Sequence, residues 1–311
     1  MEISELSTFL AVARHGGITH AAGALHTVQS NVTARIKALE GEIGAPLFAR
    51  HSRGMTLTPA GHRLMPYAIR MAALMGEALQ AAREDGTPRG TLRVGAMETT
   101  AAVRLPPVLA RFHSQHPTVV LTVRTGPTAD LVEAVRDGHL DAAFVAGPVD
   151  LPDISASFAF QEELVLVSAA RWPSLKALRG SFAGRGPTAL VFRAGCSYRQ
   201  RLEQVLAAYG WPGAARLEFG TLEGIIGCIA AGMGVSLLPR AVIQRSDMRR
   251  HVAAHPLPRS LGLTQTLLIR RNDLQESAAL ARFREACAGD TSKQNRPADR
   301  VKLQPKIAKP R

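Results

Sequence analysis

The sequence is poor in cysteine and has neither a long apolar run nor an export signal. Its three cysteines, Cys196, Cys228 and Cys287, are too few and too scattered for a disulfide framework or a zinc site. No apolar run reaches the roughly 18 residues that a membrane-spanning helix needs. The opening segment MEISELSTFL is acidic, whereas a signal peptide begins with basic residues and an apolar block. We therefore expect a protein of the reducing cytoplasm that has no membrane partner.

Catalytic and metal-binding motifs are also missing from the sequence. It has no G-x-S-x-G, no phosphate-binding glycine loop and no H-E-x-x-H. A nucleophilic thiol at Cys196 would need a histidine partner, and the sequence places none beside it. We therefore expect no enzymatic activity, no metal and no cofactor.

Positive charge is what the sequence has in excess, with a net charge of +13 over 311 residues. The segment 291–311 holds seven Lys/Arg against one Asp, so it supplies +6 and leaves +7 on the preceding 290 residues. This basic segment has few apolar residues, which predicts disorder. The charge on the rest of the chain favours an anionic partner. Nucleic acid is one such partner, although charge alone does not separate it from a gain in solubility.

The first sixty residues have the pattern of a helix-turn-helix. Apolar residues at helical spacing predict a first helix, which ends at the glycines of positions 16–17. A short helix, a tight turn at HTVQ and a third helix follow. On the third helix Val32, Ile36 and Leu39 fall within about 60° of one another, which marks the face that packs on the core.

The opposite face of this third helix is slim and polar, as a helix that enters the major groove requires. The candidates for DNA contacts on this face and its edges are Gln29, Ser30, Thr33, Arg35 and Lys37. LFARHSRGMTLT follows at the distance expected of a β-wing. Its Arg50 and Arg53 are candidates for contacts with phosphates or the minor groove. For the helix considered alone, an ordinary solvated face is the alternative interpretation.

A single long helix is predicted from Pro59 to about Arg83. Apolar residues alternate at spacings of four and three, which is typical of a heptad seam between two helices. The seam consists of Leu64, Ala68, Met71, Met75, Ala78 and Ala82. The alternative is a helix packed on its own chain, and Pro66 is expected to kink or weaken its first turns. The segment EDGTPRG then has the composition of a linker.

Strands alternate with helices after residue 90, which predicts parallel sheets with helices on both faces. Two such halves in about 200 residues predict two lobes with a cleft between them. Strand ends and helix starts at METTAA, TGPTAD and AGCSYR offer hydroxyls and free backbone N–H groups to a ligand. The candidate ligand-binding residues there are Glu98, Thr99, Thr100, Thr128, Cys196 and Ser197.

Each candidate in the cleft also has a plainer interpretation. The hydroxyl residues can be ordinary helix caps. For Glu98, a salt bridge with Arg104, Arg193 or Arg199 competes with a role as the anchor of a ligand ammonium group.

Several stretches together resemble the LysR-type transcriptional regulators. They are FLAVARHGGITHAAGALH, ARIKALEGEIGAPLFAR, LTPAGHRL, GTLRVGA, GHLDAAFVAGP and AAGMGVSLLPR, and they span roughly residues 1–288. METTAAVRLPP, TGPTADL and FRAGCSYR further resemble a subgroup that includes a putrescine-utilisation regulator. Ser30 and Ala34 stand where many members carry Pro and Arg, so the preferred operator stays open.

The resemblance implies an α/β protein with an N-terminal winged helix-turn-helix, a long linker helix and a two-lobed, periplasmic-binding-protein-like effector domain. It implies a cytoplasmic, sequence-specific transcriptional regulator that binds double-stranded DNA and forms a homodimer and then a homotetramer. The expected effector is an amine, an amino-acid-like or a carboxylate metabolite. The expected units are the winged helix-turn-helix at 1–60, the dimerisation helix and hinge at 61–89, lobe I at 90–161 and 267–288, lobe II at 162–266, and a disordered basic tail at 289–311.

Two other functions stay open at this point. A regulator of the same family can sense redox state through Cys196 and Cys228. A solute-binding transport protein would also have two lobes, but the missing signal peptide and the ninety additional N-terminal residues argue against it.

Overall fold

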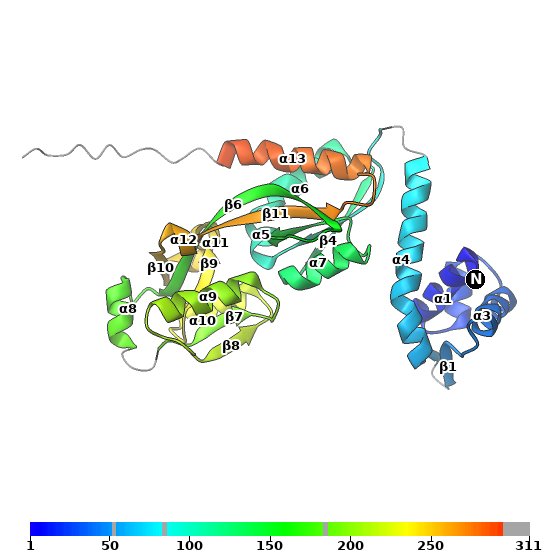
Figure 1. Cartoon of the computed structure of the whole chain (residues 1–311), viewed down its shortest axis with the longest axis horizontal. Coiled ribbons are helices and arrows are strands. Elements are labelled where there is room, and N and C mark those ends of the chain that lie inside the picture. The colour runs from blue at the N-terminus through cyan, green and yellow to red at the C-terminus, as the bar shows by residue number, and fades with distance from the viewer. Residues whose placement is uncertain (52–53, 83–85, 183–185, 295–311) are drawn as a thin grey trace, which may run out of the picture.

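The computed structural model describes residues 1–51, 54–82, 86–182 and 186–294. In Figure 1 a small helical unit packs at one end of the long helix α4 (Pro59–Ala82), and a larger α/β unit with two lobes follows along the chain. Among the described helices, none has both the length and the apolarity that crossing a bilayer requires.

The small unit consists of three helices and a two-stranded wing. Its elements are α1 (Ile3–His15), α2 (Ile18–Ala24), α3 (Gln29–Ile43), β1 (Phe48–His51) and β2 (Gly54–Leu57). α1 begins with a capping box and ends where Gly16 adopts a φ of 69°, a value that favours glycine. Val32, Ile36 and Leu39 of α3 are buried in one core with α1 and α2. The prediction of a winged helix-turn-helix is confirmed.

The larger unit is built on a seven-stranded mixed sheet with the order β10-β6-β11-β5-β3-β4, and β9 also pairs with β6. Its strands are β3 (Gly90–Ala96), β4 (Val119–Thr125), β5 (Ala142–Ala146), β6 (Ile154–Ala169), β9 (Ser236–Pro239), β10 (Val252–Pro256) and β11 (Leu263–Arg271). β3 pairs in parallel with β4 and β5, whereas β6 pairs antiparallel with β9, β10 and β11. The prediction of parallel sheets holds for β3 to β5 and for one further strand pair of the larger unit, whereas the pairings of β6 and β11 are antiparallel. The chain leaves the first lobe along β6 and returns along β11, so these two strands run in opposite directions.

The two lobes share these two long strands (Figure 1). Lobe I contains β3 to β5 and the helices α5 (Glu98–Val103), α6 (Leu105–Gln115), α7 (Thr128–Arg136) and α13 (Ala278–Gln294). Lobe II contains β9, β10, the parallel pair β7 (Ala189–Phe192) and β8 (Arg216–Phe219), and the helices α8 (Leu175–Ser181), α9 (Ser197–Ala208), α10 (Leu222–Ala230), α11 (Arg240–Arg245), η1 (Asp247–Arg250) and α12 (Arg259–Gly262). The expected lobe boundaries, 161–162 and 266–267, therefore fall inside β6 and β11.

The last helix, α13, completes the core of lobe I. Phe283 is fully buried and contacts Phe112 of α6 and Phe144 of β5, with ring centroids 5.3 and 6.2 Å apart. Helix formation is cooperative, so a helix anchored in this way can continue over polar residues. α13 reaches Gln294, and the expectation of disorder was therefore wrong for 289–294. Residues 295–311 lie outside the described part of the chain.

Candidate functional site

The outer face of α3 is accessible from end to end. Gln29, Ser30 and Lys37 are exposed, and Thr33 and Arg35 are partly exposed. The Thr33 hydroxyl donates a hydrogen bond to the Gln29 carbonyl oxygen over 2.8 Å. Its oxygen therefore faces outward as an acceptor, and its methyl group is the other surface that a base could contact.

Glu40, the carboxylate at the far end of this face, is turned toward the wing. Its Oε1 accepts hydrogen bonds from the backbone N–H groups of Leu47 at 2.7 Å and Phe48 at 3.3 Å. The carboxylate thus fixes the start of β1 against α3. The negative charge of Glu40, which would repel a DNA phosphate, is thereby bound to the backbone of the wing.

The wing packs against the turn between α1 and α2. The Met55 N–H donates to the Gly16 carbonyl oxygen over 2.8 Å, and a Cβ at Gly54 would lie only 2.5 Å from that oxygen. Gly54 also has a φ of 130°, so this close approach requires glycine. Arg50 is exposed on β1, whereas Arg53 lies outside the described residues.

A pocket between the lobes collects four of the six predicted ligand-binding residues. It has an empty volume of about 440 Å³, and Glu98, Thr99, Thr128 and Cys196 line it. The walls come from the start of α5, the start of α7 and the loop between β7 and α9, as expected for helix starts that face a cleft.

The other two predicted residues do not line this pocket. Thr100 is buried in α5 with 2% of its surface exposed. Ser197 faces a neighbouring hollow together with Arg199 and Gln200. Both lie beside lining residues in the sequence, and the turn of each helix directs their side chains elsewhere.

Sequence reasoning missed part of the lining of the pocket. The additional residues with large side chains are Met97, Phe192, Arg193, Tyr198 and Phe219. Arg193 was considered only as a partner of Glu98. Tyr198 follows directly after Ser197 at the start of α9, and a search for small hydroxyl residues at helix starts passed over it.

Two charged side chains line the pocket, Glu98 and Arg193, and the arginines near them pair with other carboxylates. Arg104 pairs with Glu162 over 2.8 Å, and Arg199 pairs with Glu218 over 3.1 Å. Within the described part of the chain, neither Glu98 nor Arg193 forms an ion pair. Of the two interpretations of Glu98, the salt bridge with a nearby arginine is thus not present.

The chain matches two family descriptions over nearly all of the described residues. Residues 3–62 match the bacterial regulatory helix-turn-helix protein of the lysR family. Residues 85–291 match the LysR substrate binding domain. The chain belongs to the LysR family of transcriptional regulators. A DNA-binding helix-turn-helix is therefore joined to an effector-binding domain, as the sequence predicted.

Known LysR-family proteins resemble the chain over almost their whole length. It is 41% identical over 283 residues to the HTH-type transcriptional regulator GltR of Bacillus subtilis (strain 168), covering 91% of this chain and 95% of that one. It is 26% identical to full-length CbnR in complex with its target DNA, with a TM-score of 0.66 over 93% of this chain and 99% of that one. Full-length OxyR from Pseudomonas aeruginosa, at 22% identity and a TM-score of 0.66, covers 94% of each chain and has the same fold.

The cysteines of this LysR-family regulator do not favour redox sensing. Burial raises the pKa of the Cys196 thiol, which therefore stays protonated and weakly nucleophilic. Cys196 packs against the apolar core that contains Tyr198, whereas Cys228 packs against a separate core around α10. Both thiols are free. Membership of the family likewise does not favour a solute-binding transport protein.

The linker helix α4 of this regulator presents an apolar stripe to its surroundings. Tyr67, Met71 and Leu74 are exposed by 62%, 41% and 52%, at helical spacings of four and three. Ala68, by contrast, is fully buried in the helix-turn-helix core, so it is not part of an exposed seam. The exposed stripe is thus turned by about 50° from the predicted seam and shares Met71 with it.

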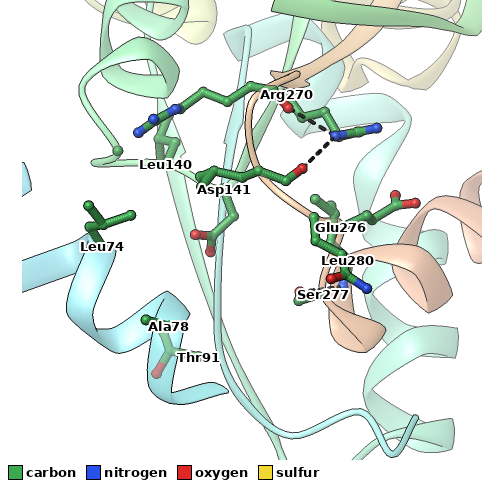
Figure 2. A pocket seen from close by; sticks show the side chains of 13 residues that line it. Leu74, Ala78, Thr91, Leu140, Asp141, Arg270, Glu276, Ser277 and Leu280 are labelled. Atoms are coloured by element: carbon green, nitrogen blue, oxygen red, sulfur yellow. Dashed lines mark hydrogen bonds between the residues drawn. The ribbon is translucent and has the colours of Figure 1, made fainter. Parts of the chain in front are cut away.

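This stripe borders a hollow between α4 and lobe I. Figure 2 shows Leu74 and Ala78 of α4 on one side and Leu140, Asp141 and Leu280 on the other. The hollow has apolar walls and a polar rim that includes Arg270 and Glu276. An apolar helix face beside such a hollow is a surface on which another helix can pack.

Proposed function

We propose that the regulator reads DNA with the outer face of α3 in the major groove and contacts the backbone with its wing. The reading residues are Gln29, Ser30, Thr33, Arg35 and Lys37. The observation that supports this most is the burial of the opposite face of α3 together with the turning of Glu40 toward the wing. Arg50 is the backbone contact of the wing, and a similar role for Arg53 stays a prediction.

Substitutions of Thr33 test this placement. Thr33→Ala should lower the discrimination between a selected operator and a scrambled duplex by about 1–3 kcal/mol. Thr33→Val keeps the methyl group and Thr33→Ser keeps the hydroxyl, so the variant that loses discrimination identifies the contacting group. Arg50→Ala should instead weaken binding to both duplexes and reduce the salt slope by about 1. Binding should be measured at several salt concentrations, and wild-type behaviour of all four variants would place the DNA surface elsewhere.

We further propose that the effector is amino-acid-like, with its ammonium group at Glu98 and its carboxylate at Arg193. Both side chains line the pocket, and within the described chain neither has an ion-pair partner. A zwitterion would satisfy both charges at once, whereas a simple amine or a simple carboxylate would satisfy one. Thr99, Thr128 and Cys196 complete the wall around such a ligand, and no catalytic role is assigned to the cleft.

Glu98→Gln tests the ammonium site with almost no change of shape. A ligand that binds only the folded protein raises its melting temperature, so a panel of amines, amino acids and carboxylates can be screened by thermal shift. We expect amino acids to stabilise the wild type and to lose this effect in Glu98→Gln, which should keep its operator affinity. Glu133→Gln, an exposed carboxylate of α7 outside the pocket, is the matched control. A panel in which only amine-free acids shift the protein, with Glu98→Gln responding normally, would overturn the amine site.

The regulator is also proposed to act in the cytoplasm as a homodimer joined through α4, and as a homotetramer formed from two such dimers. The exposed stripe at Tyr67, Met71 and Leu74 supports the dimer. A dimer presents two copies of α3, which suits an operator with two half-sites.

A further inference from the structure

Two buried hydroxyl groups in the wall of the pocket lack hydrogen-bond partners. Thr99 and Tyr198 are exposed by only 4% and 3%. Neither Thr99 Oγ1 nor the Tyr198 hydroxyl makes a hydrogen bond to any residue that the structure describes. Buried polar groups are nearly always paired, because an unpaired one has lost its water without compensation. Two such groups lining one pocket therefore point to a ligand that supplies the partners.

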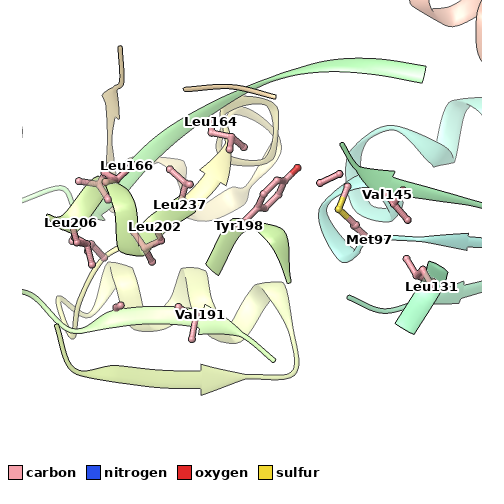
Figure 3. Packing of buried hydrophobic residues seen from close by; sticks show 14 of the residues in the cluster. Met97, Leu131, Val145, Leu164, Leu166, Val191, Tyr198, Leu202, Leu206 and Leu237 are labelled. Atoms are coloured by element: carbon pink, nitrogen blue, oxygen red, sulfur yellow. The ribbon is translucent and has the colours of Figure 1, made fainter. Parts of the chain in front are cut away.

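The two hydroxyls come from opposite lobes. Thr99 belongs to α5 of lobe I and Tyr198 to α9 of lobe II. Figure 3 shows the Tyr198 ring directed from lobe II toward Met97 and Val145 of lobe I. A ligand group that binds both hydroxyls would therefore join the lobes.

The chemistry of these hydroxyls defines what they can bind. Burial raises the pKa of the Tyr198 phenol, and the negative charge of Glu162 raises it further, so the phenol stays protonated and donates. The Thr99 hydroxyl lies close enough to the phenol to offset part of this rise, as a hydrogen bond would, although the two oxygens do not reach hydrogen-bonding geometry. A threonine hydroxyl can both donate and accept. A ligand oxygen that accepts from Tyr198, on a group that can also donate to Thr99, satisfies the pair.

A second carboxylate is a poor candidate for this position. Glu162 is 4% exposed in its side chain and already forms a bidentate pair with Arg104, over 2.8 and 2.9 Å. Another negative charge near Glu162 would be repelled, and the cation beside Glu162, Arg104, is already held in the bidentate pair. The lining of the pocket also includes the apolar side chains of Met97, Phe192 and Phe219.

We propose that the effector is an amino acid whose side chain ends in an uncharged hydrogen-bonding oxygen, a carboxamide or a hydroxyl, held between Thr99 and Tyr198. This rests on the proposed amino-acid effector and adds the chemistry of its side chain. Glu98 and Arg193 bind the charged end, and the two hydroxyls bind the other end. The uncharged oxygen is thereby the group that distinguishes the effector from other amino acids.

The test compares ligands and variants that differ by single groups. L-glutamine, L-asparagine and L-serine represent the proposed class, and L-methionine and L-glutamate are near-isosteres of glutamine without the carboxamide. Each is titrated calorimetrically into the full-length wild type, Tyr198→Phe and the control Tyr209→Phe, whose phenol lies outside the pocket lining. We expect one of the first three to bind the wild type at least about tenfold more tightly than methionine and glutamate. Tyr198→Phe should remove this preference, and Tyr209→Phe should keep it.

The melting temperature without ligand gives an independent readout. Tyr198→Phe removes a hydroxyl that has no partner, so it should leave the melting temperature unchanged or raise it. A clear fall would show that the hydroxyl is bonded within the protein and would overturn the inference. Equal or tighter binding of methionine or glutamate, or a preference that survives in Tyr198→Phe, would overturn it while leaving the amino-acid effector intact. If no amino acid binds the wild type, both the inference and the proposed amino-acid effector are wrong.

Discussion

Replacing Met71 by glutamate should separate the dimer and cause the largest loss of DNA binding of any single substitution in α4. Met71 lies in the middle of the exposed stripe of α4, between Tyr67 and Leu74. In a symmetric dimer, the carboxylate would be desolvated against the same region of its partner, where it meets a second copy of its own charge. A monomer binds a single half-site, so the operator affinity should fall by about 10²–10⁴-fold.

Analytical ultracentrifugation and binding to a selected operator measure the two parts of this result. Gly76→Glu is the matched control, because it adds the same charge to α4 on the opposite side of the helix. Gly76 is exposed, and a Cβ there meets nothing within 4 Å. An intact Met71→Glu dimer, or equal dissociation of both variants, would show that the stripe is not the dimer contact.

Removing Arg104 is expected to destabilise the effector domain more than removing any surface ion pair. Its guanidinium holds Glu162 in a bidentate pair, and the side chains are exposed by 16% and 4%. It also lies over the Phe160 ring at 5.7 Å. Arg104→Met leaves a buried carboxylate unpaired, which typically costs about 3–5 kcal/mol. The loss should appear in the urea-unfolding transition of the effector domain.

A double variant separates the loss of the pair from the loss of packing. Arg104→Met with Glu162→Leu removes both charges and should recover most of the stability, because a buried ion pair adds little over apolar residues of similar size. Arg136→Met breaks an exposed pair with Asp153 and should change stability little. A double variant as unstable as Arg104→Met would mean that the shape of the arginine, rather than its charge, supports the fold.

The small unit could be predicted closely, because its core obeys a simple period. Val32, Ile36 and Leu39 repeat at helical spacing, and the structure buries all three. The seam of α4 was predicted less well. Heptad spacing does not determine which of two neighbouring stripes of α4 packs against the core of the same chain and which stays exposed. Ala68 packs into the helix-turn-helix core, which leaves Tyr67 and Leu74 exposed instead.

In the larger unit, local patterns found the elements but not their long-range pairing. Exposed and buried residues do not alternate regularly along the first half of β6, ISASFAFQ, so a local pattern does not mark it as a strand. Its place is fixed by pairing with β11, more than ninety residues later. The same reason explains the omission of Tyr198 and the uncertain role of Arg193. Which side chains face a cleft between lobes depends on how the two lobes meet.

The effector class was predicted only in part from the sequence. Glu98 stood out as a carboxylate among helix starts, and its lack of an arginine partner became visible only when Arg104 and Arg199 were seen to pair elsewhere. The resemblance to a subgroup with a putrescine-utilisation regulator stays a prediction. A diamine would leave Arg193 unpaired, so the ligand titrations also bear on that resemblance.

The most direct test of sequence-specific reading by α3 is selection of bound duplexes from a random library by the full-length protein at fixed salt. We expect enrichment of an inverted repeat whose half-sites lie about 10–10.5 base pairs apart, or a multiple of that spacing. The enriched positions should change or weaken when the library is selected with Thr33→Ala. Recovery of no preferred sequence by the wild type, or of the same sequence at the same enrichment by Thr33→Ala and wild type alike, would contradict reading by this face of α3.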